Sequence, residues 1–310
     1  MLGREDIGSR VVVRRIVGIR DNRPLFSDAL GELVELDESG LTVATRKGPV
    51  RIGYGEIQAA KRVPPGVREV TRLEHIANAA WPAPVVGTLG DWLLRAADGW
   101  TGRANTALPI GNPGIGREAA IDAVTEWYAA HGLPARMNVP LPLCAPLDAA
   151  LDARGWARSM PSLVLTAKLA AVMAAAPPQP DLPPVRLDRA PTAAWLAVVA
   201  GRKGGLPPAA HHVLTAARPV RFAAVEEDRA IGRGAVVDGH LHIALLEVAE
   251  TARRRGLARH VTRALAEWGA SEGAGTAFLQ VESANAPALA LYASLGFTKH
   301  HEYVTRTLRT

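Results

Sequence analysis

Two stretches of this chain repeat one another, and the repeat restricts the folds open to the chain more than any other feature of its sequence. At a constant offset of 141 positions, without gaps, the matching residues are Glu126-Trp127 with Glu267-Trp268, Gly132 with Gly273, Gly155-Trp156 with Gly296-Phe297, and Thr166 with Thr307. Alanine matches mean little in an alanine-rich chain, but aromatic residues and glycines in one register carry weight. Because a fixed period marks repeated supersecondary units, we expect a tandem duplication.

Each copy shows the same order of expected elements: a helix, a short strand, a second helix, a glycine beside an aromatic residue, and a final strand. The short strands run from Ala135 to Val139 and from Thr276 to Val281. This order predicts a mixed α/β (α+β) sheet in each copy. The Pro- and Ala-rich residues 173–184 are typical of a linker, because proline donates no backbone hydrogen bond. We therefore expect one domain over 67–172 and another over 185–310.

Residues 1–66 have a different pattern, with short β-branched runs separated by turn residues. Arg10–Val17 and Leu41–Arg46 are two such runs, and Asp21-Asn22-Arg23-Pro24 is a turn signal between strands. About five short strands in one small unit favour a closed sheet, since closure removes exposed strand edges. The layout resembles an SH3-like or Sm-like barrel and ends at Pro64-Pro65-Gly66.

Composition excludes several classes of protein. No apolar run approaches the roughly 20 residues that cross a bilayer, and the first residues lack the apolar stretch of a secretory signal. A single cysteine, Cys144, excludes an internal disulfide and a cysteine-rich metal site. We expect a protein of the cytoplasm without membrane contact.

The net charge of +6 and the pI of about 9.9 favour polyanionic partners such as nucleic acid, acidic proteins or a phosphate-rich cofactor. An arginine-rich composition without functional meaning is the simpler interpretation. Within the first unit the basic residues are Arg10, Arg14, Arg15, Arg46, Lys47, Arg51, Lys61 and Arg62. They leave open a weak nucleic-acid contact, although only Phe26 and Tyr54 are available there for base stacking.

A basic turn in the second copy has the chemistry of a phosphate site. The apolar strand 241–248 is followed by Arg253-Arg254-Arg255-Gly256-Leu257-Ala258, and then by a helix with Leu257, Val261, Leu265 and Trp268 at helical spacing. Backbone N–H groups of such a turn and the helix dipole favour an anion, and Gly256 permits close approach. A solvated basic loop is the alternative interpretation.

A second motif follows the next strand, with Asn285, Leu291-Tyr292 and Gly296-Phe297 in order. Together the two motifs resemble the GNAT superfamily of N-acetyltransferases. Its phosphate-loop pattern is Arg or Gln, two residues, Gly, one residue, Gly or Ala, and Arg253, Gly256 and Ala258 meet it. The match is close from about residue 220 to 310 and weaker before.

The resemblance implies acetyl-CoA as co-substrate and an amine as acceptor, either a small molecule or a protein. In this family the cofactor lies between two splayed parallel strands, which here would end near Val248 and Val281. The residues that the resemblance assigns to the cofactor are Leu246 and Val248 through their backbone, Arg253, Arg254, Arg255, Gly256, Leu257 and Ala258 around the pyrophosphate, and Asn285 on the pantetheine arm. Tyr292 matches the family's general acid, with helix packing as the alternative.

The general base, which removes a proton from the attacking amine, has several candidates. His242 is six residues before Val248 and so on the same side of the strand by simple alternation. Glu247 is the second candidate, and Glu250 and Glu282 compete with it. The remaining histidines, His211-His212 and His300-His301, have no metal-ligand spacing, and we expect no metal.

The first copy lacks these groups. At the same offset Arg253 corresponds to Asn112, Gly256 to Ile115 and Tyr292 to Leu151, which cannot donate a proton. We therefore expect 67–172 to be a degenerate copy without its own catalysis. Residues 91–95 and 100–105, with Trp92 and Trp100, are expected to pack in the core or, alternatively, to contribute to the acceptor site.

Two functions follow from these patterns. The first is an N-acetyltransferase that works by direct attack of an amine on acetyl-CoA in a ternary complex. The second is a regulatory or partner-binding module that binds coenzyme A without turnover.

Overall fold

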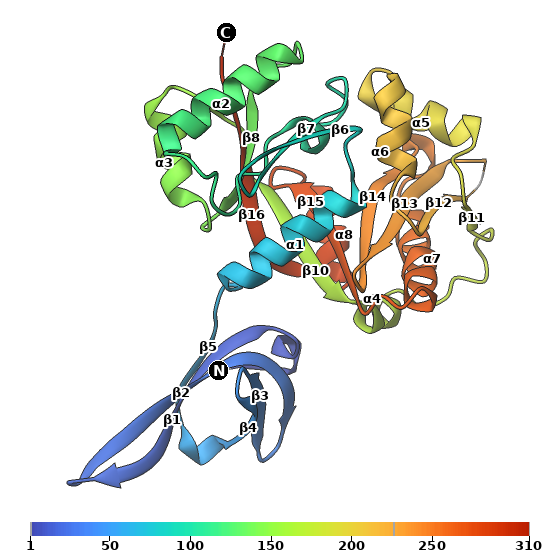
Figure 1. Ribbon diagram of the computed structural model, residues 1–310. Helices are drawn as coiled ribbons and strands as arrows, with labels where there is room; N and C mark the ends of the chain where they lie inside the picture. The colour runs from blue at the N-terminus through green and yellow to red at the C-terminus, as the bar shows by residue number, and fades with distance from the viewer. Residues whose placement is uncertain (1, 226, 310) are drawn as a thin grey trace. The chain divides into compact units, whose positions relative to one another are not determined.

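The computed structural model describes residues 2–225 and 227–309, and the chain divides into two compact units, residues 1–66 and 67–310 (Figure 1). None of the helices in the described residues has the length and apolar character needed to span a membrane. Each unit is considered by itself.

The first unit is an antiparallel sheet of five strands in the order β4-β3-β2-β1-β5. Its elements are η1 (Arg4–Asp6), β1 (Arg10–Arg20), β2 (Arg23–Asp37), β3 (Gly40–Thr45), β4 (Gly48–Gly53), η2 (Tyr54–Glu56) and β5 (Ile57–Arg62). Alternate residues on one face form its core: Val11, Val13, Ala29, Leu33, Leu41, Val43 and Ile52.

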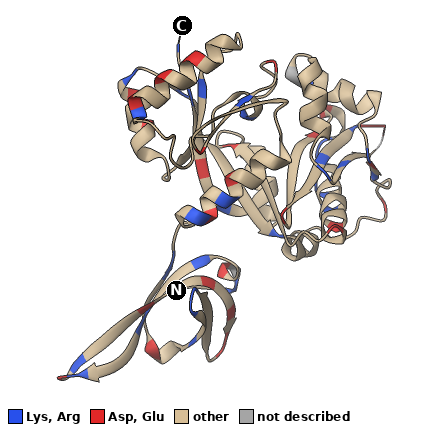
Figure 2. Ribbon diagram, viewed as in Figure 1, with Lys and Arg blue, Asp and Glu red and all other residues tan. Residues whose placement is uncertain are grey.

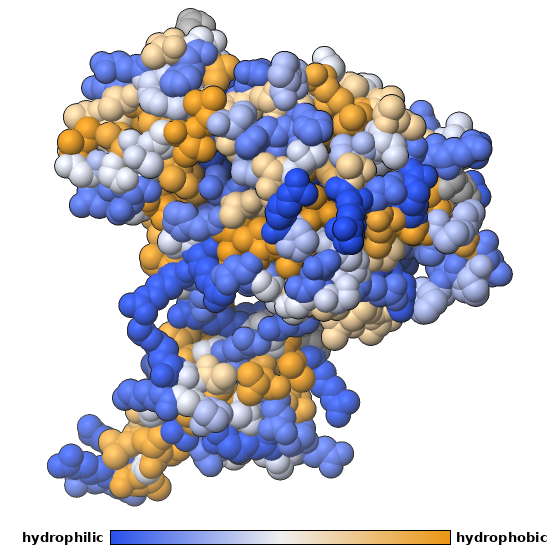
Figure 3. Space-filling model, turned by 45° about the vertical axis from the view of Figure 1, so that its right-hand side comes forward, coloured by the Kyte–Doolittle hydropathy of each residue, from blue (hydrophilic) through white to orange (hydrophobic). Residues whose placement is uncertain are grey.

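The closed barrel predicted for this unit is wrong. In the described residues β4 and β5 are the two ends of the strand order, and no pairing joins them. The physical reason lies in β1 and β2, whose pairing runs from Arg10↔Glu32 to Arg20↔Arg23. Asp21 and Asn22 have positive φ angles of 49° and 60°, which suits a two-residue hairpin turn. The long hairpin that results extends past the core and leaves apolar side chains exposed along it (Figure 3).

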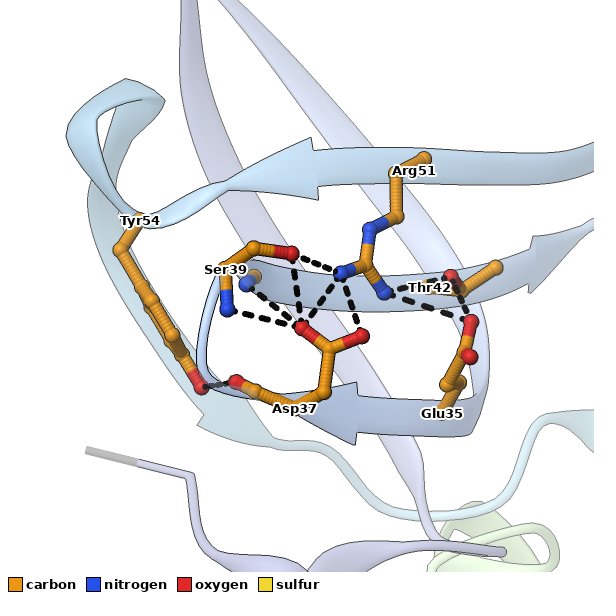
Figure 4. A network of polar contacts seen from close by, with 7 residues as sticks. Glu35, Asp37, Ser39, Thr42, Arg51 and Tyr54 are labelled. Carbon is orange, nitrogen blue, oxygen red and sulfur yellow. Dashed lines mark hydrogen bonds and ion pairs between the residues drawn. The ribbon is translucent and has the colours of Figure 1, made fainter.

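Basic and acidic residues are interspersed in the first unit (Figure 2), and several of the arginines pair with carboxylates. Arg14 makes two hydrogen bonds to Asp28 at 2.9 and 3.1 Å, and Arg62 pairs with Asp6. Arg51 bonds both carboxylate oxygens of Asp37 at 2.6 and 2.7 Å in the network drawn in Figure 4. This pairing, together with Ser39, lowers the pKa of Asp37. The basic character of the sequence is thus balanced locally, which gives no support to the nucleic-acid contact.

The second unit contains all the remaining elements. Its first part comprises α1 (Val67–Ala80), β6 (Val85–Leu89), β7 (Trp92–Ala96), η3 (Arg103–Asn105), α2 (Arg117–Ala130), β8 (Arg136–Leu141), α3 (Ala145–Ala153), β9 (Ala157–Arg158), β10 (Ser162–Lys168) and α4 (Leu169–Ala175). Its second part comprises β11 (Arg186–Asp188), α5 (Ala193–Lys203), α6 (Pro208–Thr215), β12 (Val220–Val225), β13 (Ala230–Val237), β14 (His240–Val248), η4 (Glu250–Ala252), α7 (Leu257–Ser271), β15 (Thr276–Glu282), α8 (Ala286–Ser294) and β16 (Thr298–Thr307).

One mixed sheet joins the two parts of this unit. Its order is β11-β12-β13-β14-β15-β10-β16-β8, with β9 also paired to β16. Strand β10 lies between β15 and β16 and pairs antiparallel with both. The first part therefore contributes a strand to the middle of the second part's sheet. Only β14 and β15 are parallel neighbours within this order.

The helices cover both faces of this sheet (Figure 1). On one face α4, α7 and α8 enclose a core that includes Leu257, Val261, Leu265 and Tyr292. On the other face α1, α5 and α6 enclose a core with Ile76, Trp195 and Phe222. Trp92 and Trp100 are both buried, as the packing interpretation predicted.

The C-terminal end of α4 packs against α7 through polar contacts. Arg259 Nη1 donates to the carbonyl of Ala175 at 2.7 Å, and Arg263 Nη1 donates to those of Met173 and Ala176 at 2.8 and 2.6 Å. Because the last carbonyls of a helix lack partners within it, these two arginines stabilise the end of α4.

Candidate functional site

Strands β14 and β15 diverge after a short parallel pairing. In the described residues they pair only from His240↔Thr276 to His242↔Phe278, although β14 continues to Val248 and β15 to Glu282. On their outer sides both strands remain paired, β14 to β13 as far as Val248 and β15 to β10 as far as Glu282. We call this feature the strand divergence.

A β-bulge in β14 accompanies the divergence. Ile231 of β13 pairs with Glu247 of β14, and Arg233 pairs with Ala244. Three residues along β14 therefore match two along β13. Leu245, inside the bulge, has a φ of 53°, which is uncommon for a leucine. Bulges bend a strand and increase its twist, and this one turns the end of β14 away from β15.

The backbone at the end of β14 is directed into the divergence. The N–H of Ala249 donates to the carbonyl of Arg229 at 2.7 Å, on the β13 side. Since N–H groups alternate in direction along a strand, those of Val248 and Leu246 face the β15 side. The structure thus presents polar backbone groups where an extended ligand can pair with them as an added strand.

The basic turn before α7 has the form that an anion requires. Gly256 has a φ of 81° and directly precedes α7, without a side-chain cap on the helix. The first turn of α7 contains no acidic residue, so its N–H groups and the positive end of its dipole lack an anionic partner from this turn. Arg253 is exposed and pairs weakly with Glu250 at 3.5 Å. A phosphate group fits this arrangement.

Tyr292 lies on α8 with only 8% of its surface exposed, packed edge-on against Phe297 with 5.6 Å between ring centroids. Burial, together with the nearby carboxylate of Glu247, raises the pKa of its hydroxyl to about 12. The phenol therefore keeps its proton throughout the neutral range, as a proton donor must.

Asn285 begins α8 at the end of β15. Its side-chain oxygen accepts a hydrogen bond from the N–H of Ala288 at 3.2 Å and so caps the helix. The capping role of Asn285 was not predicted from the sequence.

The placement of His242 corrects the argument from alternation. Val248 and Leu246 pack with the core on the α7 face, whereas His242 stacks on Phe278, which belongs to the core on the opposite face, with 4.9 Å between their centroids. The bulge at Leu245 inserts one residue and reverses the alternation, so the prediction that His242 and Val248 share a side is wrong. Burial lowers the pKa of His242 well below its usual value, and Arg103 and Arg233 lower it further.

The carboxylates near the end of β14 differ in exposure. Glu247 is partly buried and forms an ion pair with Arg202 of α5. Glu250 is 87% exposed beside Arg253, and Glu282 at the end of β15 is exposed.

A polar cluster at the base of the divergence was only partly anticipated. Arg103 of η3 donates through Nη1 to Oε1 of Gln280 at 2.5 Å, and the same nitrogen lies 3.3 Å from Nε2 of His242. The His242 nitrogen is in turn 3.0 Å from Gln280 Oε1. Arg233 of β13 adds a second guanidinium. The segment 100–105 was singled out from the sequence, but Gln280 and Arg233 carry no local signal because their partners are distant in the chain.

Residues 67–305 match the family described as "Probable histone acetyltransferase Rv0428c C-terminal". The chain is 29% identical over 314 residues to the probable histone acetyltransferase Rv0428c of Mycobacterium tuberculosis, covering 95% of this chain and 93% of that protein. It is 27% identical over 254 residues to the uncharacterized N-acetyltransferase YobR of Bacillus subtilis, covering 77% of this chain and 99% of that protein.

Solved structures share the fold. A GCN5-related N-acetyltransferase from Kribbella flavida aligns with a TM-score of 0.59 at 15% identity, over 80% of this chain and 97% of that one. A tandem GNAT protein from the clavulanic acid biosynthesis pathway aligns with a TM-score of 0.51 at 18% identity, over 80% and 89% of the two chains. The chain therefore belongs to the Rv0428c C-terminal family of GNAT-type N-acetyltransferases and is an acyltransferase.

Proposed function

We propose that this protein transfers the acetyl group of acetyl-CoA to an amine, and that the acetyl-CoA lies at the strand divergence. The observation that carries this proposal is the combination of two features at the same end of the sheet. The backbone of Leu246 and Val248 is directed into the divergence, and Gly256, directly before α7, follows eight residues after Val248.

In this proposal the backbone of Leu246 and Val248 binds the pantetheine arm, and the N–H of Val248 polarises the thioester carbonyl. The turn from Arg253 to Ala258, including Arg254, Arg255 and Leu257, binds the pyrophosphate through backbone N–H groups and guanidinium charge. Asn285 contacts the pantetheine arm through the part of its amide that does not cap α8.

The transfer requires two proton movements. The amine nitrogen forms a bond to the acyl carbon while the carbon–sulfur bond breaks, and the departing thiolate takes a proton from Tyr292. The high pKa of Tyr292 supports this role because the phenol is protonated at neutral pH.

The amine must give up a proton to a base, and we assign this role to Glu247 rather than His242. His242 is completely buried and its Nε2 contacts Arg103 and Gln280, so it is poorly placed to take a proton from an amine, whereas Glu247 is partly exposed. Glu247 lies at the end of β14 between Val248 and the bulge, and its carboxylate is near enough to Tyr292 to affect that residue's pKa. His242 instead orients Gln280.

We further propose that residues 67–310 descend from two tandem acetyltransferase-like copies, of which only the second binds the cofactor. The elements α2, β8 and α3 begin within one residue of α7, β15 and α8 once the offset of 141 is applied, and β9 coincides with the start of β16. Strand β10 pairs with β15 just as β16 pairs with β8, a reciprocal exchange that supports an internal duplication.

The direct test is isothermal titration of the full chain with acetyl-CoA, followed by thiol release from acetyl-CoA with a panel of amines. Binding at one site per chain together with amine-dependent thiol release supports the proposal. Binding without thiol release for any amine would favour the alternative of a module that binds coenzyme A without turnover. Absence of binding to the folded chain would overturn both.

A further inference from the structure

We propose that the acceptor amine carries an anionic group, a carboxylate being the best match, and that Arg103 binds this group at the base of the strand divergence with Arg233 as a second positive charge behind it. This inference rests on the proposed function and assigns its acceptor class. It comes from charge that the protein itself leaves uncompensated.

Arg233 is a fully buried guanidinium with incomplete hydrogen bonding. Its Nε donates to the carbonyl of Leu214 at 2.8 Å, but within the described residues Nη1 and Nη2 have no hydrogen-bond partner. Its guanidinium carbon lies 5.0 Å from the ring centroid of Trp81. Leaving a charged group buried without an anionic partner is costly, so Arg233 is an uncompensated positive charge that a nearby anion would stabilise.

Arg103 lies against the same indole, with its guanidinium carbon 5.2 Å from the Trp81 centroid. Its hydrogen-bond partners in the described residues, Gln280 and His242, are both contacted through Nη1. Neither partner is negatively charged. Burial lowers the pKa of both arginines, and the charge of Arg103 lowers the pKa of Arg233 further.

The other titratable groups around the cluster offset these two charges only in part, through the favourable effect of Glu74 and Tyr303 on Arg103. Glu74 of α1 lies 2.7 Å from Nε2 of the buried His301 of β16, which engages its carboxylate. Arg95 of β7 adds a further positive charge, and Tyr303 of β16 is kept neutral by burial, which raises its pKa. With His242 also neutral, the cluster holds three guanidinium groups against one carboxylate.

The position of the cluster suits an acceptor. Gln280 lies two residues beyond Phe278, the last residue of β15 that pairs with β14, so it stands on the diverging part of the strand. Arg103, Gln280, Ala244 and Leu245 are all partly exposed, whereas Arg233 is buried behind them. A small anion can therefore reach Arg103 directly, and Arg233 acts on it through its field.

The same charges disfavour a strongly cationic acceptor. The relative from Mycobacterium tuberculosis is described as a probable histone acetyltransferase, which concerns that protein. In this chain a lysine-rich peptide would approach a protein of net charge +6 and, at the divergence, two guanidinium groups without carboxylate partners. Like charges repel more strongly where water is excluded.

The test uses thiol release from acetyl-CoA by the full-length protein with matched acceptors. Each α-amino acid of a panel is assayed beside its primary amide and beside the amine formed by its decarboxylation. The amino group of the amide is less basic than that of the acid, and the decarboxylated amine is more basic. We expect the acid of at least one set to exceed both neutral counterparts in kcat/KM by about 10- to 100-fold, the range of a charge-assisted hydrogen bond. Equal rates, or rates ordered by amine basicity, would overturn the proposal.

Two variants separate charge from packing. Arg103→Gln should remove the preference for the acid mainly through KM, while the Kd of acetyl-CoA stays unchanged. Arg103→Lys keeps a positive charge and should retain most of the preference. A preference that survives Arg103→Gln would contradict the assignment. If the wild-type protein does not bind acetyl-CoA, the result instead contradicts the proposed function itself.

A second measurement does not depend on turnover. Crystals soaked in sodium bromide should show anomalous scattering from bromide beside the Arg103 guanidinium in the wild type and none there in Arg103→Gln. No peak beside Arg103 in the wild type would overturn the proposal even if acetyl-CoA binds.

Discussion

The second unit contains two regions with the same order of elements and different chemistry at the start of their first helix. The first turn of α2 carries Glu118, which pairs with Arg154 at 3.1 Å. The first turn of α7 has no acidic residue and follows three arginines. A helix N-terminus favours a negative charge, and the first turn of α2 carries one of its own whereas that of α7 carries none. The comparison shows how a shared scaffold can lose or keep an anion site through its first helical turn.

The second helix of each region differs in the same sense. Leu151 on α3 corresponds to Tyr292 on α8, and Cys144 at the start of α3 corresponds to Asn285, which caps α8. Leu151 is completely buried and Tyr292 is nearly so. Both positions thus pack under the sheet, but only the second presents a proton donor.

The largest effect that separates the regions is expected from Gly256→Glu. A carboxylate at this position repels the pyrophosphate, and the positive φ of 81° adds strain of roughly 1–2 kcal/mol for a residue with a Cβ. We expect acetyl-CoA affinity to fall by more than 100-fold in isothermal titration.

Two controls sharpen this result. Ile115→Glu places the same charge on an exposed side chain at the equivalent position of the first region and should leave the Kd unchanged. Gly256→Ala contributes the strain without the charge and should weaken binding less. If Ile115→Glu weakens binding as much as Gly256→Glu, the cofactor does not distinguish the two regions.

The next largest effect concerns Tyr292. Tyr292→Phe removes the proposed proton donor with little change in shape, so kcat should fall by about 10²- to 10⁴-fold while the Kd of acetyl-CoA stays constant. Tyr128→Phe removes another buried phenol, whose hydroxyl bonds to the backbone of Arg95, and should alter stability rather than kcat. A kcat within twofold of the wild type in Tyr292→Phe would show that this residue only packs.

The two regions also show which parts of the structure could be predicted from the sequence. The strand predicted from Thr276 to Val281 and the helix predicted after Gly256 follow from hydrophobic periodicity and glycine positions, which act locally, and the structure has β15 at Thr276–Glu282 and α7 from Leu257. The face of His242 was misjudged because a bulge at Leu245 reverses the alternation, and a leucine gives no sign of one. The contact of Arg103 with Gln280 spans 177 residues, and only the folded sheet brings the two together.

The N-terminal sheet illustrates the same limit. Its strands and turns were recognisable, but closure depends on how long β1 and β2 stay paired to each other. The turn at Asp21 and Asn22 was identified, while the continued pairing beyond the core was not. Strand identity is thus a local property here, whereas sheet closure is a global one.

A smaller effect is expected from acid, and it should arise in the second region. Burial, together with His301 and His240, lowers the pKa of His300 to about 4. The equivalent position in the first region is Ser159. A histidine whose pKa is lower in the folded state than in the unfolded state contributes stability at pH values above its unfolded pKa, near 6.5. This stability is lost as the pH falls toward 4. From pH 7.5 to pH 5 we expect His300 to account for about 2 kcal/mol of lost unfolding free energy.

Urea unfolding followed by tryptophan fluorescence measures this loss, because all seven tryptophans lie between residues 81 and 268 and report on the second unit. His300→Gln should reduce the difference between the two pH values by about that amount. His212→Gln, at an exposed position, is the control. If His300→Gln and the wild type lose the same unfolding free energy between pH 7.5 and pH 5, His300 is not the group whose titration causes the loss.

The smallest effect tests whether the first region could accept the cofactor once its own anion is removed. Glu118→Gln deletes the carboxylate at the start of α2, and exposed charges near a helix N-terminus contribute about 0.3–1 kcal/mol, so the stability change should lie in that range. The number of acetyl-CoA molecules bound per chain should remain one. The turn before α2 lacks counterparts of the three arginines that precede α7, and it has Ile115 in the position of Gly256. A second bound acetyl-CoA in Glu118→Gln would show that one carboxylate, rather than the whole turn, separates the two regions.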